Sequence, residues 1–202
     1  KMMALQLSSY DGKPESLTLV EKKVVLPEDG QVLVKIAASP VNPSDLMFLR
    51  GLYGFKKNLP TVPGFEGSGV IVAAGKDLRS RALLGRRVAC GAVDTHDGTW
   101  AEYMITMSDR CIPLRKAISD EQGATLIVNP LTAWSLMEQA VRKHHKAMVQ
   151  TAAASALGRM VLNLGKHFNI PIIHIVRRNE QVELLRSLGA EHVLNSTESE
   201  FD

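Results

Sequence analysis

Residues 146–176 read KAMVQTAAASALGRMVLNLGKHFNIPIIHIV, and this stretch decides the fold of the chain. It begins and ends with short apolar runs, KAMVQ and PIIHIV, which are typical of buried strands. Between them, apolar residues recur with the spacing of one face of an α-helix. These residues are Leu157, Met160, Val161, Leu164 and Phe168. The stretch therefore predicts a strand, a helix over 158–168 and a second strand.

The same alternation continues toward the C-terminus. Residues 180–188 have a helical pattern that Gly189 ends in the expected C′ position, and residues 191–194 form a third strand candidate. Strand–helix–strand–helix–strand is half of a doubly wound α/β sheet. A complete sheet of this kind has about six strands and each further unit takes ~30 residues, so we expect a C-terminally incomplete polypeptide, short by at least ~80 residues.

The N-terminal part has a different texture, with short strands separated by proline and glycine turns. Residues 31–38 (QVLVKIAA) alternate apolar and polar side chains, as a half-buried strand does. Further strand candidates are 67–74, 86–92 and 100–106. Ser119 and Asp120 resemble a helix start. We therefore predict a β-rich domain over 1–117 and a second, α/β domain over 118–202.

Composition excludes several classes of protein. The chain has 202 residues, 45% hydrophobic and 22% charged, with a net charge of +3, which is ordinary for a globular protein. That charge suits an anionic small molecule and falls short of a nucleic-acid footprint. No apolar run approaches the ~18 residues of a membrane span. Two cysteines, Cys90 and Cys111, make no disulfide framework, and we expect buried thiols in a reducing compartment, the cytoplasm.

The turn after the first α/β strand carries the first chemical signal. Its small residues, 152–158, allow a backbone to approach a pyrophosphate, and the following helix N-terminus offers free N–H donors. The usual glycine-rich form is missing, because only Gly158 remains. An alanine-rich helix start packed for steric reasons is the alternative. The candidate cofactor-binding residues of the turn are Ala154, Ser155, Ala156, Leu157 and Gly158.

The end of the second strand indicates which dinucleotide binds. An acidic residue for ribose hydroxyls is expected there, but the sequence has Arg177 and Arg178. Guanidinium groups suit a 2′-phosphate, so NADPH is favoured over NADH. The alternative is two solvated arginines at a strand end. Asn195, at the end of the third strand, is a further candidate for cofactor binding.

Five stretches in order resemble the medium-chain dehydrogenase/reductase superfamily. They are 41–45 (VNPSD), 50–53 (RGLY), 62–69 (VPGFEGSG), 129–133 (NPLTA) and the 152–158 turn with its arginine-ended strand. The resemblance is strongest to the zinc-free quinone oxidoreductases and the mitochondrial-type 2-enoyl thioester reductases. It implies a GroES-like N-terminal domain and the first half of a Rossmann NADPH-binding domain.

The resemblance also bears on metal. Members of the alcohol dehydrogenase branch bind zinc through a cysteine and a histidine, whose positions are Asn42 and Phe65 here. Neither side chain suits Zn²⁺, and Glu66 alone makes no site. His144 and His145 are adjacent and interpreted as solvated. We therefore expect no metal.

Without a Lewis acid, reduction of a quinone or an activated C=C bond by hydride from NADPH is the expected chemistry. The resemblance places a tyrosine at the active-site cleft, where Tyr53 is the candidate hydroxyl donor. A surface aromatic is the alternative for Tyr53. Asn42 and Asp45 flank the cleft by resemblance, although Asp45 suits a helix cap equally well. Thr132 corresponds to a segment beside the nicotinamide, or caps its own helix.

The resemblance leaves a second class of function open. Some members are non-catalytic NADPH-binding crystallins that also associate with RNA, but a charge of +3 gives this little support. As partners we expect a small-molecule substrate and, in the full-length protein, a second copy in a homodimer. We expect neither nucleic acid nor membrane, and a mitochondrial location is the alternative if a transit peptide has been removed.

Overall fold

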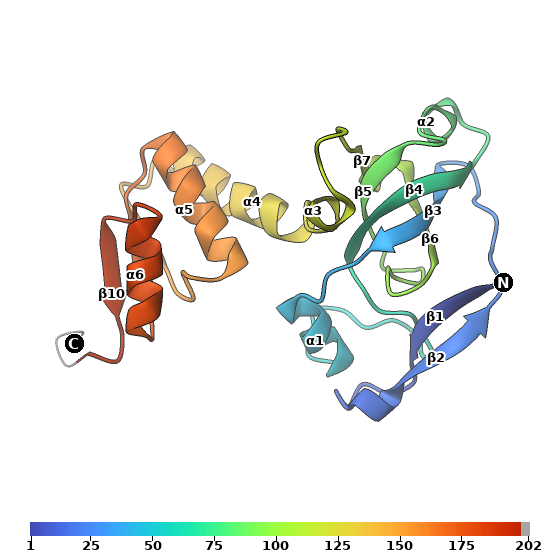
Figure 1. Ribbon diagram of the computed structural model, residues 1–202, viewed down its shortest axis with the longest axis horizontal. Helices are drawn as coiled ribbons and strands as arrows, with labels where there is room; N and C mark the ends of the chain where they lie inside the picture. Colours follow the sequence, from blue (N-terminus) through green and yellow to red (C-terminus); the bar gives the residue numbers. More distant parts are fainter. Residues whose placement is uncertain (199–202) are drawn as a thin grey trace. The chain divides into compact units, whose positions relative to one another are not determined.

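The computed structural model describes residues 1–198 (Figure 1). The chain divides into two compact units, with the boundary between Val128 and Asn129. The last four residues of the predicted 118–202 domain lie outside the described residues. The unit boundary follows Val128 rather than residue 117, because the helix at 120–124 packs within the first unit.

The first unit is built on a five-stranded antiparallel sheet in the order β6-β3-β4-β5-β7. Its strands are β3 (Gln31–Ala38), β4 (Glu66–Ala74), β5 (Arg87–Gly91), β6 (Tyr103–Met107) and β7 (Cys111–Pro113). Alternate residues of these strands form one buried cluster that includes Val32, Val34, Ile71 and Val88. The predictions for β3, β4 and β5 are confirmed, whereas β6 begins three residues later than the predicted strand.

Short elements complete the unit. They are a hairpin of β1 (Met2–Leu7) and β2 (Leu17–Lys22), the helices α1 (Pro43–Leu49), α2 (Leu78–Ala82) and α3 (Asp120–Ala124), and the 3₁₀ turns η1 (Pro14–Ser16) and η2 (Ser108–Arg110). The hairpin and β7 escaped the sequence analysis. Strand β1 is held partly by distant segments, since Leu5 N donates to Trp100 O and Leu7 N donates to Thr61 O.

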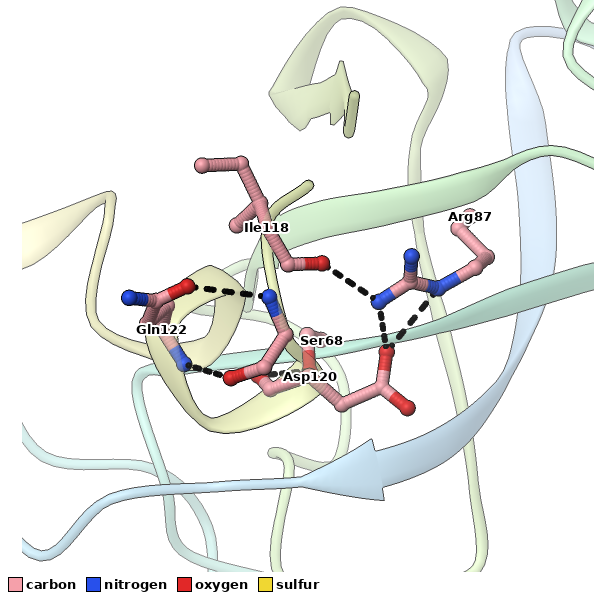
Figure 2. A network of polar contacts seen from close by, with 6 residues as sticks. Ser68, Arg87, Ile118, Asp120 and Gln122 are labelled. Atoms are coloured by element: carbon pink, nitrogen blue, oxygen red, sulfur yellow. Dashed lines mark hydrogen bonds and ion pairs between the residues drawn. The ribbon is translucent and has the colours of Figure 1, made fainter. Parts of the chain in front are cut away.

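A polar network fastens α3 to the sheet (Figure 2). Arg87, on β5, donates from Nε and Nη2 to Asp120 Oδ1 and from Nη2 to Ile118 O. Ser68, on β4, donates to Asp120 O at 2.6 Å. Ser119 caps the helix as predicted, because its Oγ accepts from Gln122 N. These contacts place α3 in the first unit and explain where the boundary lies.

The second unit contains the predicted parallel sheet, in the order β10-β9-β8. Its strands are β8 (Met148–Gln150), β9 (Ile172–Val176) and β10 (His192–Asn195), and its helices are α4 (Val128–Arg142), α5 (Ala156–Phe168) and α6 (Asn179–Ser187). The predicted apolar face of α5 is confirmed: Val161 packs in one cluster with Met137 of α4 and Ile172 of β9.

The two cysteines are buried and lie opposite one another on β5 and β7, as free thiols. Burial raises the pKa of Cys90 and raises the pKa of Cys111 to about 12. The expectation of buried thiols is confirmed. Within residues 1–198, no helix has both the length and the apolar character that crossing a bilayer requires.

The start of α1 corrects one expectation. Asn42 is the N-cap, Pro43 occupies the first turn, and Asp45 is the third helical residue rather than the cap. Asp45 Oδ2 accepts from Asn42 N at 2.7 Å, which is one half of a capping box. Asp45 is only 1% exposed, and burial raises its pKa from 3.8 to about 6, with a further contribution from the nearby Glu66 carboxylate.

This raised pKa predicts a pH dependence of stability. The folded state favours protonated Asp45, so ionised Asp45 destabilises it at pH 7 by about 3 kcal/mol, a cost that vanishes below pH 4. The Asp45→Asn variant carries no such cost. Its free energy of unfolding, measured in urea, should therefore rise relative to the wild type by about 3 kcal/mol between pH 3 and pH 7. Exposed Asp109→Asn is the control, and a pH-independent difference for Asp45→Asn would contradict the assignment.

Candidate active site

A buried carboxylate organises the candidate substrate site. Glu66, the first residue of β4, is 1% exposed. Its Oε1 accepts from Asn42 Nδ2 at 2.8 Å, and its Oε2 accepts from the N–H groups of Ile127 and Val128, both at 2.9 Å. In the sequence, Glu66 is a lone carboxylate that makes no metal site. The structure shows that it fixes the amide of Asn42 and ties β4 to the start of α4.

An aromatic cluster lies next to Glu66. Phe65 packs edge-on against Phe48 of α1, with ring centroids 5.5 Å apart. The Tyr53 ring lies against the Phe65 ring, with centroids 4.8 Å apart, and meets the Phe55 ring edge-on, with centroids 5.3 Å apart. The loop after α1 is therefore folded back onto the residue that precedes Glu66.

Tyr53 combines a fixed ring with an accessible hydroxyl. The residue is 38% exposed, and its hydroxyl has no hydrogen-bond partner within residues 1–198. An isolated surface aromatic would not have two ring neighbours within about 5 Å. Tyr53 contacts Phe65 and Asn42 donates to Glu66, so each of the two predicted catalytic residues contacts one member of this adjacent pair; that both act at one site stays a prediction.

The positions that resemble zinc-ligand positions have other partners. Phe65 belongs to the aromatic cluster, and the Asn42 amide donates to Glu66. Across residues 1–198, no three His, Cys, Asp or Glu side chains are grouped closely enough to hold one metal ion. His144 and His145 are exposed, as predicted. The expectation of a metal-free protein stays a prediction.

The second unit has a cavity of about 470 Å³ at the carboxyl ends of β8 and β9. Among the predicted cofactor residues, Ala154, Ser155 and Arg177 line it. Gln181 and Ser196 also line it, and the sequence analysis did not find them. This is the edge of a parallel sheet at which α/β proteins bind nucleotides.

The turn before α5 fits a phosphate group. Ser155 is the N-cap and its Oγ accepts from Gly158 N at 3.1 Å. The N–H groups of Ala156 and Leu157 have no acceptor in the described part of the chain, so both remain for a ligand. A Cβ at Gly158 would lie 2.3 Å from the Ala153 carbonyl oxygen. Glycine is therefore required where the helix passes closest to the strand end.

Two polar side chains, Gln150 and the buried His174, hold this turn on the sheet. Gln150 ends β8, and its Nε2 donates to Gly158 O at 3.1 Å and to His174 Nδ1 at 2.7 Å. His174 is 1% exposed, and burial, then His192 and Lys166, lower its pKa. A lone histidine in the apolar run PIIHIV was the signal for this contact, and the sequence analysis did not use it.

The remaining predicted cofactor residues differ in their surroundings. Arg177 and Arg178 are exposed, and among residues 1–198 no carboxylate forms an ion pair with either guanidinium. Asn195 is 7% exposed; its Nδ2 donates to Asn179 Oδ1 and its Oδ1 accepts from Thr197 N. Those bonds give Asn195 a structural role at the end of β10. Thr132 lies exposed in α4.

The chain is similar in sequence to known proteins. Residues 28–116 match the model of the alcohol dehydrogenase GroES-like domain. A mitochondrial enoyl-[acyl-carrier-protein] reductase of Caenorhabditis elegans is 34% identical over 180 residues, which are 87% of this chain and 50% of that protein. The chain thus spans about half the length of the curated relatives that it matches.

Solved structures agree in fold over nearly the whole chain. A candidate NADPH:quinone reductase from Mesorhizobium loti has a TM-score of 0.90 at 38% identity, covering 99% of this chain and 61% of its own. A mycobacterial protein solved with NADPH has a TM-score of 0.81 at 26% identity, covering 96% of this chain and 58% of its own. The ordered motifs, the fold and these matches agree: the chain belongs to the medium-chain dehydrogenase/reductase superfamily, in the zinc-free branch of quinone oxidoreductases and 2-enoyl thioester reductases.

Proposed function

We propose that the protein is an NADPH-dependent oxidoreductase that reduces quinones or activated C=C bonds, in 2-enoyl thioesters or enones, by direct hydride transfer without zinc. One observation carries the proposal: Tyr53 presents an unpartnered hydroxyl on a ring that packs against Phe65, the residue before the Glu66 that fixes the Asn42 amide. The names of the relatives support the same class of reaction. The first unit would act on the substrate and the second would bind the cofactor.

The residues of the second unit fit NADPH. The N–H groups of Ala156 and Leu157, at the α5 N-terminus, would bind the pyrophosphate. The Arg177 guanidinium lines the same cavity and would bind the 2′-phosphate, with Arg178 beside it. The small side chains of Ala154 and Ser155 leave the backbone accessible to a ligand. We keep Thr132 as a candidate contact and assign Asn195 to the support of the β10 end.

The first unit would stabilise the charge that develops during reduction. NADPH, when bound, supplies the hydride. Negative charge then gathers on a carbonyl or quinone oxygen, which needs a hydrogen-bond donor in a site poor in water. The Tyr53 hydroxyl is free to donate, and its ring is already packed, so little ordering is needed at the moment of reaction.

Two classes of substrate, enoyl thioesters and quinones, fit the proposal. The curated relatives are named as enoyl reductases, whereas several structural neighbours are named as quinone reductases. A quinone accepts hydride readily and depends less on a donor than an enoyl thioester does. Consumption of NADPH with a crotonyl thioester and with a quinone, followed by absorbance at the nicotinamide band, tests both directly.

The non-catalytic alternative gives a different outcome in that assay. A crystallin-like protein would quench NADPH fluorescence on binding and consume none with either substrate. Tyr53 and the arginines after β9, of which Arg177 lines the cavity, favour the enzyme. For location we propose the cytoplasm, with the mitochondrion as the alternative suggested by the names of the curated relatives. We propose a homodimer for the full-length protein.

The cofactor assignment predicts a selective loss in Arg177→Ala. Charge-assisted hydrogen bonds to a phosphate contribute roughly 1.5–3 kcal/mol, so NADPH affinity should fall about 10- to 150-fold while NADH affinity changes little. Fluorescence titration with both cofactors measures this. Arg186→Ala, at the far end of α6, removes the same charge and should leave both affinities unchanged. Equal losses for the two cofactors would show that Arg177 supports only the fold.

The donor assignment predicts a loss of turnover in Tyr53→Phe, which keeps the ring and its packing. A donor aimed at developing charge contributes ~2.7–4 kcal/mol, so kcat should fall about 10²–10³-fold with little change in the KM for NADPH. The fall should be larger with an enoyl thioester than with a quinone. Unchanged kcat on the better substrate would remove Tyr53 from the mechanism.

A further inference from the structure

The loop that carries Tyr53 is fastened at a second point, Lys57. The Lys57 ammonium reaches the segment between β5 and β6 and donates to two backbone carbonyls there. Its Nζ lies 3.1 Å from Val93 O and 2.6 Å from His96 O. Neither acceptor is a carboxylate, so the contact depends on direction and distance as well as on charge.

Tyr10 fixes the backbone of the same residue. Lys57 N donates to the Tyr10 hydroxyl, and that hydroxyl lies 2.8 Å from Lys57 O, to which it donates. The Tyr10 ring meets Phe48 edge-on at 5.4 Å. Both the side chain and the main chain of Lys57 are therefore tied to parts of the first unit outside the loop.

The Lys57 ammonium is partly removed from water, which costs free energy, whereas the side chain of Lys56 is exposed. Lys57 is half-buried, and burial lowers its pKa, although Asp94 and Asp97 act in the opposite direction. Lys56 is exposed, with its Nζ 5.5 Å from the Tyr10 ring centroid. A loop lysine normally keeps its ammonium in water, so partial burial at 57 indicates that the contact has a positional purpose.

The contacts form a continuous path from Lys57 to Tyr53. Phe55 lies between them in sequence and meets Tyr53 edge-on. On the other side, Tyr10 packs on Phe48, and Phe48 packs on Phe65, which lies against Tyr53. If the loop shifts at Lys57, the Tyr53 ring loses its contact with Phe55, with Phe65 or with both.

We propose that Lys57 is a positioning residue: its ammonium and its backbone, held by Val93, His96 and Tyr10, fix the loop so that the Tyr53 hydroxyl points at the substrate oxygen. The inference rests on the donor role proposed for Tyr53. A misplacement of about 1 Å at a reacting centre can cost on the order of 10²-fold in rate, so a fastening four residues away in sequence is enough to matter.

The test is a double-mutant cycle on the better of the two substrates. Lys57→Met removes the ammonium and keeps the stem, and it should lower kcat about tenfold or more, with the KM for NADPH within about twofold. In a Tyr53→Phe background the hydroxyl is already gone, so adding Lys57→Met should lower kcat by less than about twofold. Lys56→Met is the matched control and should change kcat by less than about twofold in both backgrounds.

A second variant covers a failure to fold. If thermal unfolding shows that Lys57→Met is not folded at the assay temperature, Tyr10→Phe replaces it, because it removes the hydroxyl contacts and keeps the ring. The same cycle with Tyr53→Phe should show the same loss of additivity.

The outcomes separate the two claims. If Tyr53→Phe is slow and the Lys57→Met effect persists undiminished in that background, Lys57 acts on stability or on another group, and the inference is wrong while the proposed function stands. If Tyr53→Phe leaves kcat unchanged, the donor role fails, and the inference fails with it.

Discussion

The buried carboxylate of Glu66 is the interaction on which the substrate site depends. Removing a carboxylate from water costs several kcal/mol, and only well-placed donors offset that cost. Glu66 has three, from Asn42, Ile127 and Val128, each within 2.9 Å. These donors come from the N-cap of α1 and from the segment that leads into α4. The Glu66 side chain, at the start of β4, therefore sets the position of Asn42. Phe65, the residue before Glu66, packs against the Tyr53 ring.

In the second unit, small residues and side-chain hydrogen bonds fix the position of the turn before α5. The close approach of α5 to the backbone of Ala153 leaves no room for a Cβ at Gly158, and Gln150 and His174 hold the same turn by side-chain hydrogen bonds. The result is a turn with two N–H groups for an anion and an arginine at the cavity wall. Polar groups buried beneath a helix are costly when unpaired, and here each has a partner that orients the turn.

Periodicity predicted the elements whose contacts are local. The apolar face of α5 and the alternation of β3 follow from 3.6- and 2-residue repeats, and the structure confirms both. The β1–β2 hairpin was missed because its strands are joined by a long connection and because β1 also depends on Thr61 and Trp100. Glu66 was dismissed for a related reason: its donors lie 24, 61 and 62 residues away in sequence. Asn195 is predicted as a cofactor contact from its place at a strand end, and its local turn bonds to Asn179 and Thr197 could not be predicted from periodicity.

The central claim is that the Glu66 carboxylate stabilises the first unit as an acceptor and is not a tolerated buried charge. The most direct measurement is the free energy of unfolding of Glu66→Leu in urea at neutral pH. Leucine fills similar space but removes the carboxylate to which three N–H donors bind, so the account predicts a loss of at least about 3 kcal/mol. A variant as stable as the wild type, or more stable, would contradict the account. It would show that the free energy gained from the three hydrogen bonds does not exceed the free energy needed to remove the carboxylate from water.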